Sequence, residues 1–436
     1  MNNTEVVLFW FKRDLRLTDN RGLYKALSSG FRVLPVFIFD THILDKLEKD
    51  DARITFICEV LGSINRSLRQ NGSSLITFHG TPEHFFSEMP LPFPVNAVYA
   101  STDYEPYAFE RDTKIGNILR SKGMHLHLIP DQMIMEPGTV MKQDGKPYTV
   151  FTPFSRRWSS LFRAGMIKEE PSVNLFGNLL QYSPLSAEPK PETLGFMTSG
   201  LKVKPADLTS DTIKSYGDNR DIPAADGTTK LGPHLRFGTI SIREVFRQTE
   251  GLSNIFNSEL IWREFFMHIL SHFPQASEKS FRPEYDNIEW INNEEHFDRW
   301  CRGMTGYPIV DAGMRELKAT GYMHNRVRMV TASFLAKHLL CDWRWGEAWF
   351  GSKLLDFELS SNNGNWQWAA GTGCDAAPWF RIFNPAIQKQ KFDRNEEYIR
   401  SWLPDYGTPD YPEPVVNHTK ARTRALETYG RVLRKS

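Results

Sequence analysis

The chain has 436 residues, of which 53 are Lys or Arg and 52 are Asp or Glu, so its formal net charge is +1. This balance excludes a protein that binds nucleic acid through its overall charge, although a local basic face is compatible with it. The length allows two hydrophobic cores, and no apolar stretch reaches the roughly 18 residues that a membrane-spanning helix needs.

The cysteines are widely separated. Cys58, Cys301, Cys341 and Cys374 form neither a CxxC pair nor a Cys/His ligand pattern, which predicts buried thiols in a reducing compartment and no metal site. The first residues lack a basic segment followed by a long apolar run, so we expect no secretory signal. We therefore expect a cytoplasmic protein with no membrane association.

The first third of the sequence alternates between strand and helix patterns. Short runs rich in β-branched and aromatic residues predict strands at 6–11, 33–39, 74–78, 97–100 and 125–129. Amphipathic patterns predict helices at 21–28, 52–70, 82–89 and 109–122. This order predicts an α/β domain over residues 1–131, with a doubly wound, parallel, five-stranded sheet.

The loop after the first strand reads KRDLRLTDN and contains no GxGxxG turn, so a dinucleotide on the usual phosphate turn is not expected. Arg13, Asp14 and Arg16 in this loop have two interpretations: a charge network that holds the loop, or direct contact with a ligand.

Residues 132–226 are predicted to form an inter-domain connection, because Pro, Ser, Lys and Asp replace any sustained periodicity from about residue 166. Residues 227–436 are predicted to form an all-α domain. Its apolar periodicity indicates helices at 242–248, 258–272, 294–302, 307–320, 325–340, 346–355 and 396–402.

One stretch of the helical half, residues 343–385, holds six of the 12 Trp of the chain together with Asp356 and Glu358. Indole faces beside carboxylate and amide groups suit a flat, conjugated ligand, but a large aromatic core is an equal alternative. Trp366 and Trp368 would lie about 200° apart on a helix and would share a face on a strand.

A turn over residues 227–232 offers backbone N–H groups and hydroxyls that suit a phosphate, although an ordinary helix N-cap looks similar. Further along, Glu259, Trp262 and Arg263 share one face of a predicted helix at spacings of three and four residues. An acid and a cation on an otherwise apolar face favour a ligand site over a core helix.

A similar face follows at Asn325, Arg328 and Met329, where an amide, a cation and a thioether combine. Met at such a position more often packs in a core than contacts a ligand, so this spacing alone leaves both interpretations open.

Long motifs in both halves resemble one known family. ELIWREFF, TGYPIVDAGMREL, MHNRVRMVTASFL and NNGNWQWAAGTGCDAAPWFRIFNP resemble the FAD-binding half of the DNA photolyase/cryptochrome family. FWFKRDLRLTDN and YTVFTPFSRRW resemble its N-terminal antenna domain. The resemblance covers essentially the whole chain in the family's order, and several long motifs together are highly specific.

The resemblance implies an FAD-dependent photoenzyme, a deoxyribodipyrimidine photo-lyase that splits cyclobutane pyrimidine dimers in DNA with light. It assigns FAD binding to Tyr216, Thr228, Thr229, Lys230, Leu231, Gly232, Phe256, Arg263, Arg328, Asp356, Phe357, Glu358 and Asn362. Gly232 stands where the family usually has Ser, and Glu358 where it more often has Asp. Arg328 is expected to pair with Asp356, and Asn362 to face the flavin N5.

The resemblance also implies a pocket for the flipped-out dimer. The catalytic residues would be Glu259, Trp262, Asn325, Met329 and Asn362. The DNA-binding residues would be Arg220, Glu259, Trp262, Asn325, Arg326 and Trp368. An electron relay would run through Trp366, Trp343 and Trp290 and would serve photoreduction of the resting cofactor.

Asn325 and Met329 match the cyclobutane-dimer enzymes of class I, since enzymes for the (6-4) photoproduct have His at both positions. The alternatives are a cryptochrome-type photoreceptor that signals without repair, and a flavoprotein that makes no use of light. Ala108, Ser277 and Glu278 depart from the folate-binding pattern, so the antenna chromophore stays open among a deazaflavin, FMN, folate or none. The expected partner is dimer-containing DNA, and the expected state is a monomer.

Overall fold

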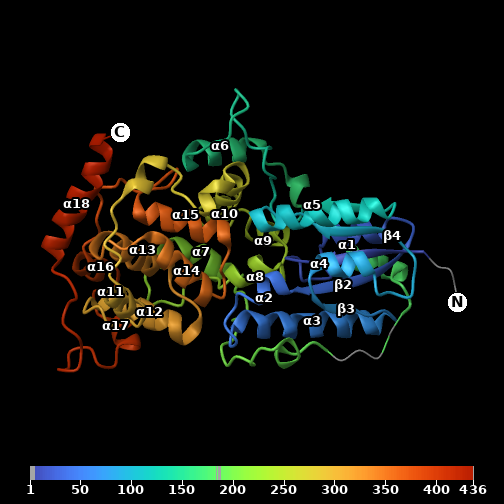
Figure 1. The fold of residues 1–436 in the computed structure, drawn as a ribbon, viewed down its shortest axis with the longest axis horizontal. Coiled ribbons are helices and arrows are strands. Elements are labelled where there is room, and N and C mark those ends of the chain that lie inside the picture. Colours follow the sequence, from blue (N-terminus) through green and yellow to red (C-terminus); the bar gives the residue numbers. More distant parts are fainter. Residues whose placement is uncertain (1–4, 183, 185–187, 436) are drawn as a thin grey trace. The chain divides into compact units, whose positions relative to one another are not determined.

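The computed structural model describes residues 5–182, 184 and 188–435, which form two compact units (Figure 1). The first unit comprises Met1–Thr139, Leu161–Ala206 and Leu231–Glu250. The second comprises Val140–Ser160, Asp207–Lys230 and Gly251–Ser436. The units are interleaved along the chain, and the domain limits at residues 131 and 226 stay a prediction.

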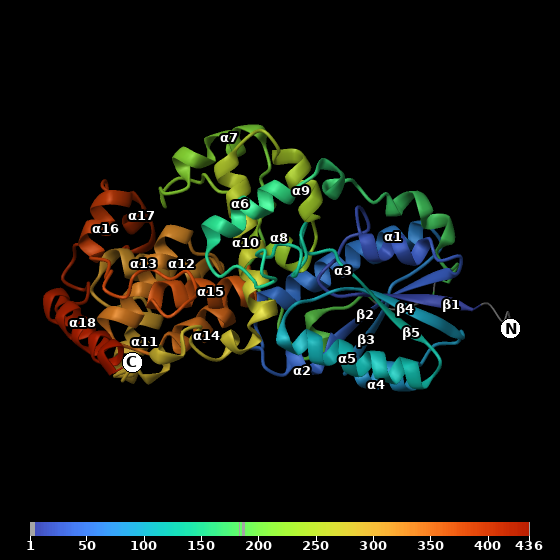
Figure 2. The ribbon, with the colours of Figure 1, turned by 90° about the horizontal axis from the view of Figure 1, so that it is seen from above.

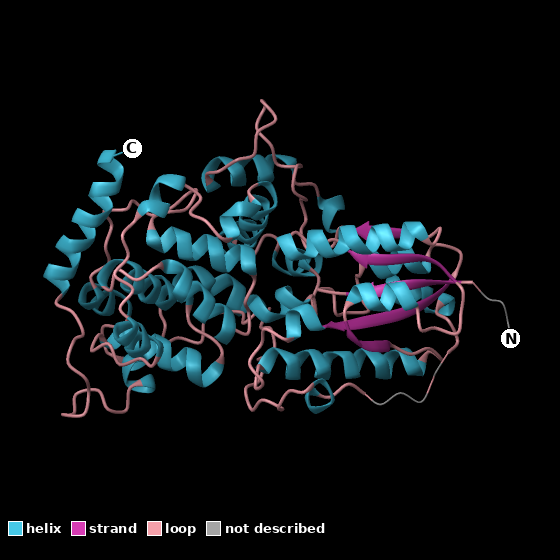
Figure 3. Cartoon of the chain, viewed as in Figure 1, coloured by secondary structure: helices cyan, strands magenta, loops and turns pink. Residues whose placement is uncertain are grey.

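The first unit contains a five-stranded parallel sheet, as predicted. Its strands are β1 (Val6–Phe11), β2 (Arg32–Asp40), β3 (Ile76–Gly80), β4 (Val95–Ser101) and β5 (His125–Ile129). They are ordered β3-β2-β1-β4-β5, and every neighbouring pair is parallel. All six residues of β1 are buried, as expected for a central strand covered on both faces. Figure 3 shows the strands confined to this unit.

Helices cover both faces of the sheet. Figure 2 shows α1 (Arg21–Leu27) and α3 (Ala52–Gln70) on one side of the strands, and α4 (Pro82–Glu88) and α5 (Pro106–Ser121) on the other. Each side has its own core, because successive side chains of β1 alternate between the two faces. The remaining helical elements of the unit are α2 (Thr41–Leu44), α8 (Gly232–Phe237), α9 (Ile242–Thr249) and three 3-10 turns, η1 (Ala164–Ile167), η2 (Ser172–Asn178) and η3 (Pro191–Leu194).

The loop after β1 is held by ion pairs within its own unit. Arg13 Nη1 lies 3.1 Å from Asp103 Oδ1 and 3.0 Å from Glu105 Oε1. Burial alone would raise the pKa of Asp103, but Arg13 and Arg236 overcome this and hold it at about 2. Arg16 pairs with Asp131. Of the two interpretations of this loop, the charge network is the one the structure shows.

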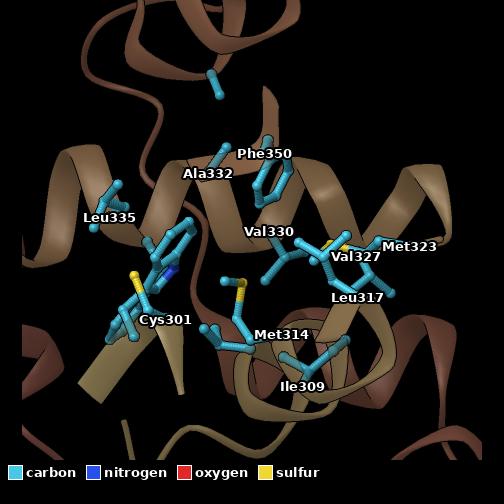
Figure 4. Close-up of a cluster of buried hydrophobic side chains, with 14 of the residues drawn as sticks. Cys301, Ile309, Met314, Leu317, Met323, Val327, Val330, Ala332, Leu335 and Phe350 are labelled. Carbon is cyan, nitrogen blue, oxygen red and sulfur yellow. The ribbon is translucent and has the colours of Figure 1, made fainter. Parts of the chain in front are cut away.

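The second unit is helical. Its elements are α6 (Phe151–Leu161), α7 (Ser210–Asn219), α10 (Asn254–His272), η4 (Pro274–Ser277), η5 (Pro283–Asn287), α11 (Glu294–Cys301), α12 (Pro308–Thr320), α13 (Asn325–Ser333), η6 (Phe334–His338), α14 (Trp343–Lys353), α15 (Leu359–Ala370), α16 (Pro385–Phe392), α17 (Glu397–Trp402) and α18 (His418–Lys435). In its core, Met314 and Leu317 of α12 pack toward Val327 and Val330 of α13 (Figure 4).

Several helical elements differ from the sequence prediction, among them one that ends early and one inside the predicted connection. The helix predicted at 325–340 ends at Ser333 and continues as the π-helical turn η6, after which Leu340 adopts a left-handed φ of 51°. Within the predicted connection, α7 forms because Thr209 caps its first turn by accepting a hydrogen bond from Thr212 N. This short polar helix lacks the long apolar period that the sequence analysis relied on.

Within the described part of the chain, no helix is both long and apolar enough to cross a membrane. Nor do the described His, Cys, Asp and Glu side chains form a group of three or more that could hold a metal ion.

Candidate functional site

A hollow lies among α13, α14 and α15 of the second unit. We call it the first hollow. Its walls include eight of the predicted site residues: Asn325, Arg328, Met329, Asp356, Phe357, Glu358, Asn362 and Trp366. Predicted residues from two helices and from the loop before α15 therefore meet in one place, and their roles toward a ligand stay a prediction.

Asp356 is the polar anchor of the first hollow. Its Oδ2 accepts a hydrogen bond of 2.8 Å from Arg328 Nη2, which is the expected pair. Arg328 Nε donates to the backbone oxygen of Met323 at 2.8 Å, so the guanidinium is fixed on two sides. Asp356 Oδ1 is buried and has no partner among the described residues. A buried carboxylate oxygen without a donor is costly, and it marks a place where a ligand N–H or O–H would fit.

Asn362 is oriented by the backbone of α14. Its Nδ2 donates to the carbonyl oxygen of Glu347 at 3.1 Å. Because a carbonyl can only accept, the amide nitrogen must face α14, and the amide oxygen is the polar atom left for the hollow. A single contact thus fixes which end of this side chain a ligand would meet.

Glu347 also holds Asn363, since its Oε1 accepts a 3.1 Å hydrogen bond from Asn363 Nδ2. Burial raises the pKa of Glu347 to about 7, and the bond from Asn363 offsets only part of this. Glu347 was not predicted as a site residue. The available signal was an acid four residues after Trp343 and three before Phe350, on a helix face that is otherwise apolar.

Glu358 closes another side of the first hollow. Its Oε1 lies 3.1 Å from Arg263 Nη2, and Ser361 Oγ donates to its Oε2 at 3.3 Å. Arg263 of α10 thereby contacts the wall of the hollow through Glu358.

Trp262 and Trp368 line a further hollow between α10 and α15, which we call the second hollow. Both indoles are half-buried, and Trp262 stacks on Phe151 with 3.6 Å between the ring centroids and 8° between the planes. Asn325 and Met329 do not line this hollow. Phe151 was not predicted as a site residue, although it stands in the motif YTVFTPFSRRW.

The helical form of α15 explains the two hollows. Trp366 and Trp368 are about 200° apart on a helix, so Trp366 faces the first hollow and Trp368 faces the second. This settles the choice between helix and strand that the sequence left open.

Glu259 of α10 pairs with Arg220 at the end of α7, with 2.6 Å between Oε1 and Nη1. Both side chains are partly exposed. Beside them, Tyr216 packs edge-on against the buried Phe256 at 5.2 Å, and burial raises the pKa of Tyr216 to about 12. These four predicted residues form a neighbouring group, but none of them lines either hollow.

Arg326 extends from α13 beside the first hollow. Its Nη2 lies 2.6 Å from Asp221 Oδ1, its Nη1 lies 3.5 Å from the sulfur of Met329, and its guanidinium covers the ring of Phe392 at 4.5 Å. Asn325, the first residue of α13, is exposed. An exposed amide beside a cation suits contact with a large polar ligand.

The turn predicted to bind phosphate does not line the first hollow. Thr229 is buried, and Lys230 Nζ lies 2.9 Å from both Thr228 Oγ1 and Asp226 Oδ1. Leu231 and Gly232, at the start of α8, belong to the first unit. Their role in cofactor binding stays a prediction.

The three predicted relay indoles lie in or against the cores of the second unit. Trp343 and Trp366 are 0% and 2% exposed in the same core, and the half-buried Trp290 packs against it. Neither Trp343 Nε1 nor Trp366 Nε1 has a hydrogen-bond partner among the described residues.

The first hollow combines a carboxylate oxygen in need of a donor, an oriented amide oxygen, a fixed guanidinium and the rings of Phe357 and Trp366. Such a set fits a flat heterocycle that carries both donors and acceptors on its edge. An isoalloxazine ring has this chemistry, so the residues present fit a flavin.

Comparisons with known proteins agree with this geometry. Residues 7–173 match the family described as DNA photolyase, and residues 256–408 match the FAD binding domain of DNA photolyase. The chain is 36% identical over 477 residues to the deoxyribodipyrimidine photo-lyase of Agrobacterium fabrum, covering 98% of each chain.

Solved structures show the same fold. A bacterial class III photolyase from Agrobacterium tumefaciens has a TM-score of 0.86 at 34% identity, and the match covers 100% of this chain and 99% of that one. An archaeal photolyase from Sulfolobus tokodaii with two FAD molecules has a TM-score of 0.80 at 35% identity, and the match covers 98% of this chain and 100% of that one.

Proposed function

Because the chain belongs to the DNA photolyase family, we propose that it binds FAD in the first hollow and repairs cyclobutane pyrimidine dimers in DNA with light. The observation that carries this proposal is the buried Oδ1 of Asp356, which has no partner among the described residues and belongs to a side chain that lines the first hollow. FAD would supply light-driven one-electron chemistry that no amino-acid side chain offers.

The residues of the first hollow would hold and orient the ring. Asp356 Oδ1 would accept a hydrogen bond from the edge of the ring, while Arg328 keeps the same carboxylate in place through Oδ2. Asn362 would present its amide oxygen, because its nitrogen is already engaged with Glu347. Phe357 and Trp366 would exclude water from the faces of the ring.

Contact with DNA would fall to the neighbouring polar groups. Arg326 and Arg220 are partly exposed cations that would bind phosphates and fix the register. Glu259 would accept hydrogen bonds from the N–H groups on the edges of the damaged bases, with Arg220 controlling its position through the 2.6 Å pair. Asn325 and Met329 would contact the flipped bases at the rim of the first hollow.

Trp262 and Trp368 would form apolar walls for the dimer. Both are partly exposed, and stacking on Phe151 fixes the plane of Trp262. Since they line the second hollow, a dimer that touches them and the first hollow together must reach around α15, or α15 must shift when DNA binds.

The relay indoles would conduct electrons inward without losing protons. Trp366 and Trp343 have no acceptor for their indole N–H, so each would keep its proton when oxidised. Trp290 is half-buried, and its proton could pass to water. The relay would thus end where proton release is possible.

The test is to load the protein with FAD, reduce it chemically, add a dimer-containing oligonucleotide and measure dimer loss with and without blue light. We expect loss only in the light. Trp366→Phe should repair as well as the parent once it is chemically reduced, but should not photoreduce. Equal dimer loss in the dark, or none in the light with FAD bound, would contradict the proposal.

Class I, a monomeric state and a cytoplasmic location belong to the same proposal. Asn325 and Met329 support class I, whereas one of the similar solved structures is a class III enzyme. The antenna chromophore stays open.

A further inference from the structure

Arg344 holds its guanidinium over the middle indole of the relay. The central guanidinium carbon lies 4.8 Å from the centre of the Trp343 ring. Trp343 itself is 0% exposed, so its ring is removed from water on every side. At such a short distance a cation disfavours a second positive charge on the ring that it covers.

Three separate segments fix the guanidinium in this position. Arg344 Nε donates to the backbone oxygen of Glu278 at 2.7 Å. Its Nη2 donates to Asp286 Oδ1 at 2.7 Å, and its Nη1 lies 3.3 Å from both carboxylate oxygens of Asp342. Burial would raise the pKa of Asp286, but bonds from Ser280 and Arg344 lower it. A side chain with this many bonds is a fixed charge rather than a mobile surface cation.

The two other relay indoles have different surroundings. Trp366 meets the rings of Trp300 and Phe350 edge-on at 6.1 and 5.0 Å, and Trp290 meets Tyr429 edge-on at 6.1 Å. Among the described residues, no cation covers either ring. The middle position therefore differs electrostatically from both ends.

The backbone also ties Trp343 to Trp290. Ile291 N donates to Leu340 O at 2.8 Å, and Asp342 N donates to Asn292 Oδ1 at 2.8 Å. Asn292 and Leu340 both adopt a left-handed φ, of 50° and 51°, where side chains other than Gly are strained. The two hydrogen bonds hold the segment of Trp290 against that of Trp343.

We propose that Arg344, whose charge is balanced by Asp286 and Asp342, is a positioning residue for the relay. Its positive charge destabilises oxidised Trp343, so that the electron vacancy moves on outward to Trp290. This inference rests on the proposed function, and specifically on the relay. With FAD bound, Trp366 would give one electron to the light-excited cofactor, Trp343 would then give one to Trp366, and Trp290 one to Trp343. A soluble thiol would finally give one electron to Trp290 and itself be oxidised, and no proton would have to leave Trp343.

The two carboxylates beside Arg344 allow the direction of its effect on oxidised Trp343 to be tested. In Arg344→Gln two carboxylates lose their cation beside Trp343, so oxidised Trp343 should become more stable. In Asp286→Asn the cation loses a carboxylate, so oxidised Trp343 should become less stable. A defect caused only by loosened packing would move both variants in the same direction.

The measurement is transient absorption of oxidised tryptophan in FAD-loaded protein that also carries Trp290→Phe, so that the vacancy stops at Trp343. Charge recombination must then return through Trp366, and its rate reports the stability of oxidised Trp343. We expect Arg344→Gln to slow recombination about tenfold, the factor that corresponds to about 1.4 kcal/mol, a size typical of one cation on a partly desolvated ring. Asp286→Asn should accelerate it.

Arg344→Lys is the matched control, because it retains the charge and should restore most of the parental rate. Urea denaturation of each variant, followed by circular dichroism, measures folding independently of light. Recombination rates that change in the same direction in Arg344→Gln and Asp286→Asn, or that do not change, would overturn the proposal. Trp366→Phe distinguishes a failure of the relay from a failure of the role given to Arg344. If this variant leaves the transient signal of oxidised tryptophan intact, the relay itself is wrong, and the inference about Arg344 is wrong with it.

Discussion

Gly346 of α14 packs against the indole of Trp366 so closely that no side chain fits between them. A Cβ at this position would lie 2.1 and 2.6 Å from two carbons of the Trp366 ring and 2.5 Å from Leu335 Cδ2. Trp366 is only 2% exposed and is packed among other rings, so it cannot move away freely. Gly346→Ala should therefore displace the first indole of the relay.

The expected magnitude follows from two opposing effects. Alanine in place of glycine in a helix interior contributes about 0.5–1 kcal/mol of stability. Overpacking a well-filled core costs about 1–3 kcal/mol. We expect Gly346→Ala to lower the free energy of unfolding by about 1–2 kcal/mol, since the steric cost exceeds the helix preference.

Urea denaturation followed by circular dichroism measures the free energy of unfolding of Gly346→Ala. An unchanged m-value would show that only the midpoint of the transition has moved. Gly430→Ala in α18 is the control in the same unit, because a Cβ there would meet only Arg434 Nη2 at 3.6 Å and Trp379 at 3.9 Å. It should gain about 0.5–1 kcal/mol. If Gly346→Ala were stabilised as much as Gly430→Ala, the packing of Trp366 against α14 would be refuted.

Three further predictions concern charge. Burial raises the pKa of Glu347 from an ordinary 4.5 to about 7, so its contribution to the free energy of unfolding is full below pH 4.5 and is lost as pH rises through 7. Glu347→Gln should remove about 1–2 kcal/mol of this pH dependence, because partial exposure of the side chain screens the rest. Denaturation at pH 4.5 and at pH 8 measures the difference. Arg243 is 0% exposed and lies 2.9 Å from Asp19 and 2.9 Å from Asp131, so Arg243→Ala should destabilise the α/β unit by about 3–5 kcal/mol; a loss under 1 kcal/mol in denaturation would contradict this. Arg326→Gln should reduce the slope of log binding constant against log salt by about 1 for damaged and undamaged DNA alike; an effect confined to damaged DNA would argue for base contact instead.

The α/β unit could be predicted closely from sequence because its signals are local. The helix at Ala52–Gln70 has the predicted limits, since Asp51 caps its first turn and Asn71 ends it. The five strands are short apolar runs separated by amphipathic helices, and parallel pairing follows from that order.

The helical unit was harder to predict where amphipathic periodicity is weak. α15 carries polar and aromatic residues on all sides because it faces a hollow on each flank, so its sequence has no single apolar face. Helix α18 was missed because its many basic residues obscure the stripe of Ala421, Ala425 and Tyr429 that is buried. The extra residue in the turn of η6 depends on tertiary packing and leaves no periodic signal.

The same limit applies to the site. Arg328 and Asp356 could be paired in advance only through the family resemblance. The contacts of Glu347, Phe151 and Arg344 depend on segments far apart in sequence or on how a side chain folds back, and residue spacing alone does not encode either.

Because α15 forms a partition with a different cavity on each flank, its length is constrained more strictly than its composition. Adding or removing one residue before Trp366 would turn both indoles by about 100° and take each of them away from the hollow that it now lines. Single replacements along this helix leave that geometry intact. We therefore expect natural variants of this segment to differ by substitution and never by insertion or deletion, a pattern that sequencing of close homologues would reveal.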